Sequence, residues 1–133
     1  MPMTIDDMLS AARRSLRRLP AAQVDAELAA GAVLVDIRPA AQRAAEGEVP
    51  EALVIERNVL EWRCDPAGDA HLDEATDHDV RWIILCSQGY TSSLAAASLQ
   101  QLGLHRATDV VGGFEALAQV RAARSGEGRP GVR

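Results

Sequence analysis

The sequence has little cysteine: among its 133 residues only Cys64 and Cys86 are cysteines. Two cysteines are too few for a disulfide framework, and a chain of this length can bury a sufficient core without disulfide or metal crosslinks. The N-terminal residues MPMTIDDML lack the basic start and apolar run of a secretory signal, so we expect a cytoplasmic protein with free thiols. Cysteine is therefore available for chemistry.

Long apolar runs and net positive charge are also missing. No stretch approaches the roughly 20 apolar residues that cross a bilayer, so no membrane span is predicted. The formal net charge is −5, which argues against a nucleic-acid partner because phosphate affinity depends on clustered lysine and arginine.

One local exception to the acidic balance is a basic amphipathic segment near the N-terminus. Helical spacing extends over residues 4–18, and we interpret the segment as a helix with a solvated basic face, packed against the domain, rather than as a partner or membrane-surface site. Its residues are Arg13, Arg14, Arg17 and Arg18, with Leu9, Leu16 and Leu19 on the apolar side.

The remaining sequence alternates strand and helix patterns. Strands are predicted at residues 32–38, 52–57, 81–86 and 107–113, and helices at 21–31, 39–47, 92–103 and 114–124. The alternation predicts an α/β fold whose central, mostly parallel sheet of four to five strands is flanked by helices. Residues 58–80 are rich in Pro, Gly and acids, with a possible helical turn at Trp62, and predict a long surface excursion. We expect an N-terminal helix at 1–19, a domain at 20–123 and a flexible tail at 124–133.

Chemistry is concentrated in ILCSQGYTSS, residues 84–93, where Cys86 ends the central apolar strand. In a strand–loop–helix the backbone N–H groups of the loop and first helical turn point into the concavity above the strand and favour negative charge. We therefore expect the Cys86 thiol to ionise readily and act as a nucleophile, with Gly89 supplying the positive φ of the curl. The predicted anion-binding loop consists of Ser87, Gln88, Gly89, Tyr90, Thr91 and Ser92. The alternative is that Cys86 is only a small buried apolar residue.

A charged pair, Asp36 and Arg38, ends the neighbouring predicted strand. The carboxyl ends of parallel strands share one edge of a sheet, so the pair and Cys86 should lie on the same rim.

Three ordered motifs resemble the rhodanese-like domain family. VLVDIRPAAQRAAEGEVPEA is similar to the family's first signature, in which a strand ends in Asp-x-Arg and a Gly-His-Ile-Pro-Gly-Ala segment follows. ILCSQGYTSS resembles the active-site loop in its Cys-x-x-Gly-x-Thr form, and DVVGGFEAL resembles the terminal strand and Gly-Gly-aromatic turn. Positions that match are Asp36, Arg38, Gly47, Pro50, Ala52, Cys86, Gly89 and Thr91; positions that depart are Glu48, Glu51 and Leu117.

The resemblance implies a three-layer rhodanese-like fold and a sulfurtransferase that needs no cofactor or metal. Cys86 would take sulfane sulfur from a small-molecule or protein donor, hold it as a persulfide and pass it to cyanide or a thiol acceptor. Asp36 and Arg38 would brace the loop. Because the loop has no cation of its own, thiosulfate is expected to be a poor donor, and an organic persulfide, a protein persulfide or a mercaptopyruvate-like compound is expected at least equally. Arg57 or Arg63 could lend charge from outside the loop.

Other interpretations stay open at this point. A cysteine phosphatase would need a longer loop with Arg at the sixth position after the cysteine, where this chain has Ser92. A non-enzymatic sulfur carrier or protein-interaction module fits the imperfect motifs, and Cys64 could be a resolving thiol. A zinc site formed by Cys64, His71, His78 and Cys86 is disfavoured because the gaps are wider than in known zinc motifs. The oligomeric state is not predicted.

Overall fold

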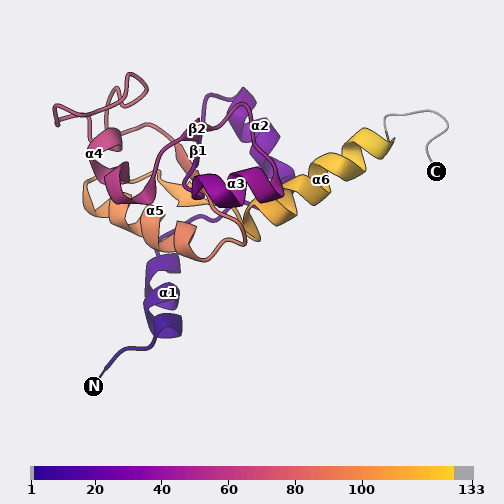
Figure 1. Cartoon of the computed structure of the whole chain (residues 1–133). Helices are drawn as coiled ribbons and strands as arrows, with labels where there is room; N and C mark the ends of the chain where they lie inside the picture. The colour runs from indigo at the N-terminus through magenta and orange to yellow at the C-terminus, as the bar shows by residue number, and fades with distance from the viewer. Residues whose placement is uncertain (1, 128–133) are drawn as a thin grey trace.

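The computed structural model describes residues 2–127 and contains one parallel sheet (Figure 1). Its strands are β1 (Val33–Asp36), β2 (Leu53–Val54), β3 (Trp82–Leu85) and β4 (Thr108–Asp109). They are arranged in the order β2-β1-β3-β4, and every pairing is parallel. The predicted α/β fold with a parallel sheet is confirmed, with four strands in the described part of the chain.

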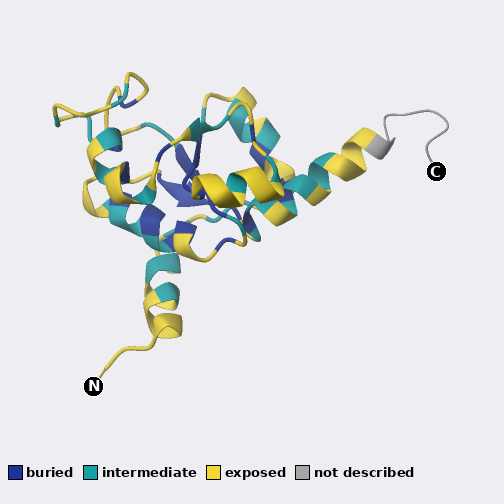
Figure 2. Ribbon diagram, viewed as in Figure 1, coloured by how far each residue is buried: buried dark blue, intermediate teal, exposed yellow. Residues whose placement is uncertain are grey.

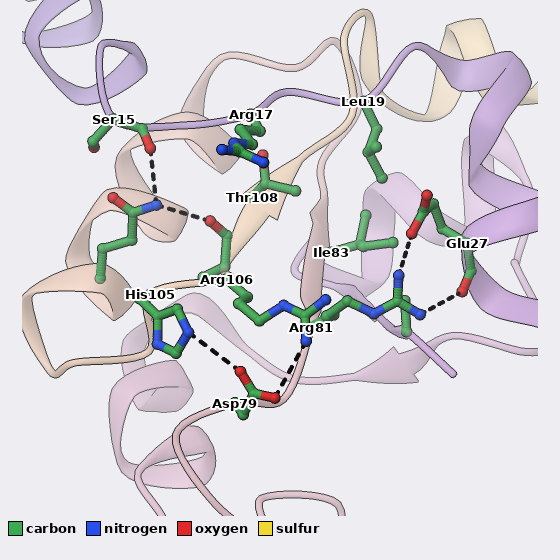
Figure 3. Close-up of a pocket in the computed structure, with 13 residues that line it drawn as sticks. Ser15, Arg17, Leu19, Glu27, Asp79, Arg81, Ile83, His105, Arg106 and Thr108 are labelled. Carbon is green, nitrogen blue, oxygen red and sulfur yellow. Dashed lines mark hydrogen bonds and ion pairs between the residues drawn. The ribbon is translucent and has the colours of Figure 1, made fainter. Parts of the chain in front are cut away.

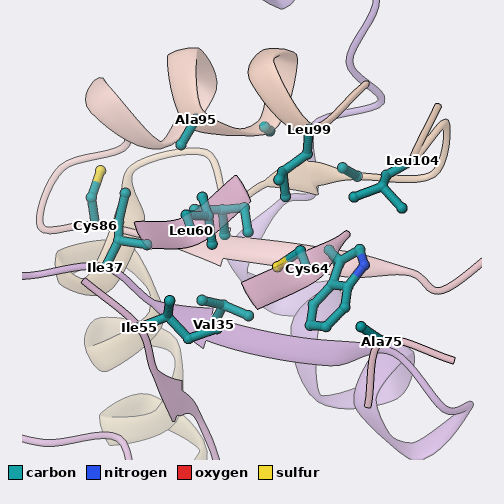
Figure 4. Close-up of a cluster of buried hydrophobic side chains, with 14 residues drawn as sticks. Val35, Ile37, Ile55, Leu60, Cys64, Ala75, Cys86, Ala95, Leu99 and Leu104 are labelled. Carbon is teal, nitrogen blue, oxygen red and sulfur yellow. The ribbon is translucent and has the colours of Figure 1, made fainter. Parts of the chain in front are cut away.

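The two central strands, β1 and β3, are buried by helices on both faces of the sheet. Helices α4 (Leu60–Cys64) and α5 (Thr91–Gln101) pack on the face of Val35 and Ile84, and α2 (Val24–Ala29) and α6 (Gly113–Glu127) on the face of Leu34 and Ile83. Helix α3 (Ala40–Glu46) links β1 to β2, and the 3-10 turns η1 (Ala21–Gln23) and η2 (Arg57–Val59) precede α2 and α4. Figure 2 shows the resulting buried interior, and Figure 4 one of its two apolar clusters. Continuous apolar runs, rather than alternating ones, are what a strand buried on both faces requires.

The N-terminal helix is shorter than predicted. Helix α1 (Ile5–Arg13) starts with a capping box between Thr4 and Asp7, packs against α5 and projects from the domain (Figure 1). It ends at Arg13, so the prediction of a helix reaching residue 18 is wrong. Beyond α1 the chain runs to the sheet edge, where the Leu19 N–H donates to the Asp109 carbonyl at 2.9 Å and the Val111 N–H to the Leu19 carbonyl at 2.9 Å. Pairing with the edge strand and burial of Leu16 and Leu19 against the core outweigh local helix propensity.

The C-terminal helix is longer than predicted. Helix α6 continues to Glu127 and includes residues that the sequence assigned to a flexible tail, and residues 128–133 of that tail lie outside the described residues. The predicted surface excursion is present as an irregular segment between α4 and β3. Among the described helices, none combines the length and apolar character needed to cross a bilayer.

Candidate active site

Cys86 lies directly after β3, at the carboxyl edge of the sheet. Asp36 pairs in register with Leu85, so the end of β1 and the cysteine share that edge, as predicted. The Cys86 side chain is buried, and its sulfur accepts a hydrogen bond from the Gly89 N–H at 3.2 Å. Gly89 has φ +85°, which is the positive φ expected for the curl of the loop.

Backbone N–H groups without a protein acceptor occur along the loop that carries this sulfur. Helix α5 begins at Thr91 without a side-chain cap. Within residues 2–127 the N–H groups of Gln88, Tyr90 and Thr91 have no protein acceptor in hydrogen-bond range. Such groups, together with the positive end of the α5 dipole, attract an anion or a thiolate. The loop is therefore suited to holding negative charge at and beside the Cys86 sulfur.

The Gly-Gly turn after β4 fixes the other side of the loop. The Phe114 N–H donates to the Cys86 carbonyl at 2.7 Å, and the Glu115 N–H to the Ser87 carbonyl at 3.1 Å. Gly113 has φ +61°, and a Cβ at this position would lie 2.5 Å from the Cys86 carbonyl oxygen. Only glycine allows the two backbones to approach so closely, which is the physical reason for glycine at position 113.

The rim of the loop faces carboxylates. The Ser87 hydroxyl donates to Glu46 at 2.8 Å and lies 3.1 Å from the Gln42 amide oxygen, while the Gln88 amide donates to Glu115 at 3.3 Å. The side chains of Ser87 and Gln88 therefore bring acidic neighbours to the rim rather than cations.

Asp36 and Arg38 form a buried ion pair behind this rim. The Arg38 Nη2 lies 2.8 Å from the Asp36 Oδ2, and both side chains are at most 1 % exposed. Arg38 also donates to Glu46 at 3.1 Å, and its guanidinium lies 4.0 Å from the centre of the Phe114 ring. Burial lowers the pKa of Arg38, but its hydrogen bonds to Asp36 and Glu46 outweigh burial and the net direction is upward. The pair is thus connected to the loop through Glu46 and Phe114, and its bracing role stays a prediction.

Two serines of the loop–helix junction point inward. Ser92 and Ser93 donate to the Asp109 carboxylate at 2.8 and 2.7 Å, and all three residues are buried. The sequence predicts that the Ser92 hydroxyl binds an anion; in the structure this hydroxyl instead fixes the start of α5 to β4. Thr91 and Tyr90 remain exposed at the rim.

The cations beside the loop come from the N-terminal segment, whose basic side chains are predicted from the sequence to form a solvated face. Arg13 and Arg18 each donate through Nη2 to the Gly89 carbonyl, at 2.7 and 2.9 Å. The expected external cations lie elsewhere: Arg57 pairs with Glu61 at 2.9 Å, and Arg63 donates to the Ala70 carbonyl. The spacing of the four arginines in the sequence does not indicate which two of them bind the loop.

Cys64 differs from Cys86 in its surroundings. Its side chain is fully buried, and Figure 4 shows it inside the apolar cluster, with Leu60 between it and Cys86 at the margin. Burial first, and then the charge of Glu61, raises the pKa of Cys64 to about 12, although Arg63 opposes this. Both cysteines are free, and no cluster of potential metal ligands occurs in residues 2–127.

Selective alkylation is the expected consequence of this difference. At pH 8 a pKa near 12 leaves Cys64 with a thiolate fraction of only about one in ten thousand, and burial blocks the reagent as well. We expect iodoacetamide to label Cys86 and leave Cys64 unlabelled in the folded protein, and to label both in urea. Peptide mass spectrometry measures the sites; a Cys64–Cys86 disulfide after mild peroxide treatment would contradict this and favour the resolving-thiol alternative.

A pocket of about 650 Å³ lies at the opposite edge of the sheet (Figure 3). Its lining includes Arg81, which precedes β3 whereas Cys86 follows it. Most of the charged side chains pair with each other: Arg81 with Glu27, and both His105 and Arg106 with Asp79 at 3.2 and 3.3 Å. This pocket is therefore separate from the cysteine loop.

Comparison with known proteins identifies a family for most of the chain. The family model for the rhodanese-like domain matches residues 20–119. No curated protein matches the chain.

Solved structures give the same result for the fold. A Rhodopseudomonas palustris protein of unknown function, described as a possible tyrosine phosphatase, is 28% identical, with a TM-score of 0.78 over 91% of this chain and 96% of its own. The human single-domain sulfurtransferase is 23% identical, with a TM-score of 0.64 over 77% and 95% of the two chains. A rhodanese-related protein from Thermoplasma volcanium is 23% identical, with a TM-score of 0.59 over 86% and 95%.

Proposed function

Because the chain belongs to the rhodanese-like domain family, we propose that it is a sulfurtransferase in which Cys86 carries sulfane sulfur as a persulfide. The observation that supports this proposal is the Cys86 sulfur itself, which accepts the Gly89 N–H within a loop of unpaired amides. Two free thiols suit a reducing compartment such as the cytoplasm.

Sulfur transfer takes place in two displacements. The Cys86 thiolate attacks the outer sulfur of the donor, the donor's bond to that sulfur breaks, and the donor leaves with the electron pair. An acceptor, cyanide or a thiolate, then attacks the terminal sulfur of the persulfide, and the Cys86 thiolate leaves. Each step exchanges one bond of sulfur for another, so electrons balance without a cofactor.

The loop amides stabilise the charge that moves through these steps. The Gly89 N–H holds the inner sulfur, and the N–H groups of Gln88, Tyr90 and Thr91 are available for the terminal sulfur and for the anionic end of the donor. Fixed backbone donors of this kind need no reorganisation as charge develops, which is how they lower a barrier.

Intact-protein mass spectrometry combined with turnover assays tests the proposal. After exposure to thiosulfate or an organic persulfide we expect a mass gain of about 32 Da on Cys86, lost on addition of cyanide or a thiol. Multiple turnovers would support an enzyme, and a persulfide that forms but transfers only once would support a sulfur carrier. If Cys86 is reactive toward iodoacetamide yet gains no sulfur from any donor, the proposal is wrong.

A phosphatase is the second candidate, because the Rhodopseudomonas palustris protein is described as a possible tyrosine phosphatase. Phosphoryl transfer by a cysteine loop depends on an arginine that clamps the phosphoryl oxygens with two hydrogen bonds. The corresponding position here is Ser92, whose hydroxyl is bonded to buried Asp109. We expect no hydrolysis of p-nitrophenyl phosphate above the uncatalysed rate; turnover lost in Cys86→Ser would favour the phosphatase.

The carboxylates at the rim favour donors of low negative charge. Glu46 is paired with Arg38 at 3.1 Å, whereas Glu115 has no cationic partner among the described residues. We expect Glu115→Gln to lower the KM for thiosulfate about two- to fivefold at low ionic strength; the effect is small because surface charges act weakly and are screened by salt. The KM for a neutral organic donor should stay unchanged, because such a donor carries no charge for the carboxylate to repel.

Glu74→Gln is the control for this prediction. Glu74 is exposed in the irregular segment between α4 and β3, so its substitution changes the net charge by the same amount at a site away from the loop. An equal fall in KM in both variants would show that net charge, and not the rim carboxylate, disfavours thiosulfate.

A further inference from the structure

The N-terminal segment, residues 2–19, lies outside the region matched by the rhodanese-like model and still contacts the active-site loop. Its four arginines divide into two pairs. Arg13 and Arg18 bond to the loop, whereas the guanidinium groups of Arg14 and Arg17 form no hydrogen bond or ion pair within residues 2–127.

Both loop-facing guanidinium groups converge on one atom, the Gly89 carbonyl oxygen. Each is held by a second contact: the Arg13 Nε donates to the Ser93 hydroxyl at 3.0 Å, and the Arg18 Nε pairs with Asp109 at 2.8 Å. Arg18 is only 17% exposed, and Asp109 is completely buried. A carbonyl fixed by two charged donors, each with its own anchor, has little freedom to rotate.

The orientation of this carbonyl determines that of the next amide. The Gly89–Tyr90 peptide is trans, like every other peptide bond described, so its C=O and N–H point in opposite directions. The guanidinium groups therefore turn the Tyr90 N–H away from themselves, and that N–H has no protein acceptor within residues 2–127. Positive charge at the oxygen also polarises the peptide and strengthens its N–H as a donor.

The segment also supplies what the loop lacks. No cation occurs between Cys86 and Ser93, where all six residues are uncharged. Two guanidinium groups held against the Gly89 carbonyl place positive charge on the side of the Gly89–Tyr90 peptide opposite the Tyr90 N–H. The Arg13 guanidinium also lies 5.7 Å from the centre of the Tyr90 ring, which adds a cation–π contact to the loop rim.

We propose that Arg13 and Arg18 are positioning residues, which hold the Gly89–Tyr90 peptide so that the loop amides stabilise charge on sulfur. The inference rests on Cys86 as the proposed sulfur acceptor, and neither arginine needs to touch the substrate. The N-terminal segment is then part of the active site rather than an appendage to the domain.

Arg13→Gln is the principal test, with Arg14→Gln and Arg17→Gln as controls that remove the same charge from the same segment. In Arg13→Gln we expect kcat for sulfur transfer to fall about five- to tenfold while the donor KM stays within twofold, because the amides matter most as charge develops. Alkylation of Cys86 by iodoacetamide at pH 7 should slow about three- to tenfold. The controls should stay within twofold of the wild type in all three measurements.

Conservative variants separate positioning from folding. Arg13→Lys keeps the charge and can reach the Gly89 carbonyl, so it should recover part of the lost rate, and Arg18→Lys keeps a cation beside buried Asp109. If Arg13→Gln matches Arg14→Gln in both kcat and alkylation rate, or if Arg13→Lys recovers nothing, the positioning role is wrong. Alkylation of Cys86 does not require sulfur transfer. A slower alkylation rate in Arg13→Gln, but not in the two control variants, therefore supports the positioning role even if the protein turns over no sulfur donor.

Discussion

Cys86→Ser is expected to abolish the proposed sulfur transfer, lowering kcat/KM by roughly a thousandfold or more, to the background rate. The only hydrogen bond to the Cys86 sulfur in the described structure is donated by the Gly89 N–H. An N–H donor stabilises a thiolate that has already ionised, but it cannot take a proton from a serine hydroxyl. Loop residues 87–93 contain no histidine or acid that could act as a base. Assays with thiosulfate and with an organic persulfide, using cyanide and a thiol as acceptors, measure the loss.

Cys64→Ala is the matched control. It removes the other thiol, which is fully buried in the core and has a raised pKa of about 12, so it should cost stability but keep kcat/KM within about threefold of the wild type. More than about one per cent of wild-type turnover in Cys86→Ser would show that the transferred sulfur is not carried on Cys86.

The central strands could be predicted from sequence because their apolar content alone identifies them. VLVD and WIIL are uninterrupted apolar runs that end at a charge or at the cysteine, and both occur as strands within two residues of the predicted bounds. The edge strands could not be delimited in this way. Six residues are predicted for β2 and seven for β4, but only two residues of each strand form backbone pairs with the neighbouring strand. Apolar composition does not indicate at which residue this pairing ends.

The local parts of the candidate site were predictable for the same reason. Gly89 between polar residues indicated a positive φ, and Asp36 and Arg38 two positions apart at a strand end indicated a pair on the rim. The distant parts were not. Arg13 and Arg18 lie 76 and 71 residues from the carbonyl they bind, and a basic helical pattern contains no information about such a partner. The position of Arg18 depends on Asp109, because a fully buried carboxylate requires a cation and hydroxyl donors as partners.

Replacing Arg38 by Met is expected to lower the free energy of unfolding by about 3–5 kcal/mol. The Asp36 side chain is 1 % exposed and would remain as a buried carboxylate without its cation, retaining only the Arg38 backbone N–H at 3.1 Å. The loss should shift the melting temperature by about 10 °C or more in a chain of this size. Urea unfolding followed by fluorescence of buried Trp82 measures it, with circular dichroism as a second probe of cooperativity.

Arg43→Met removes a guanidinium from an ion pair of the same length, since Arg43 and Glu48 also lie 2.8 Å apart. Glu48 is 53% exposed, so water solvates the carboxylate that remains, and the cost should be below about 1 kcal/mol. Equal losses of unfolding free energy in Arg38→Met and Arg43→Met would show that burial of Asp36 does not set the strength of the pair.

The double variant Asp36→Leu/Arg38→Met should be less unstable than Arg38→Met alone, because it leaves no buried charge unpaired. Its sulfur transfer should still be impaired, since Glu46 and Phe114 would lose the guanidinium that ties them, and through them the loop, to the end of β1.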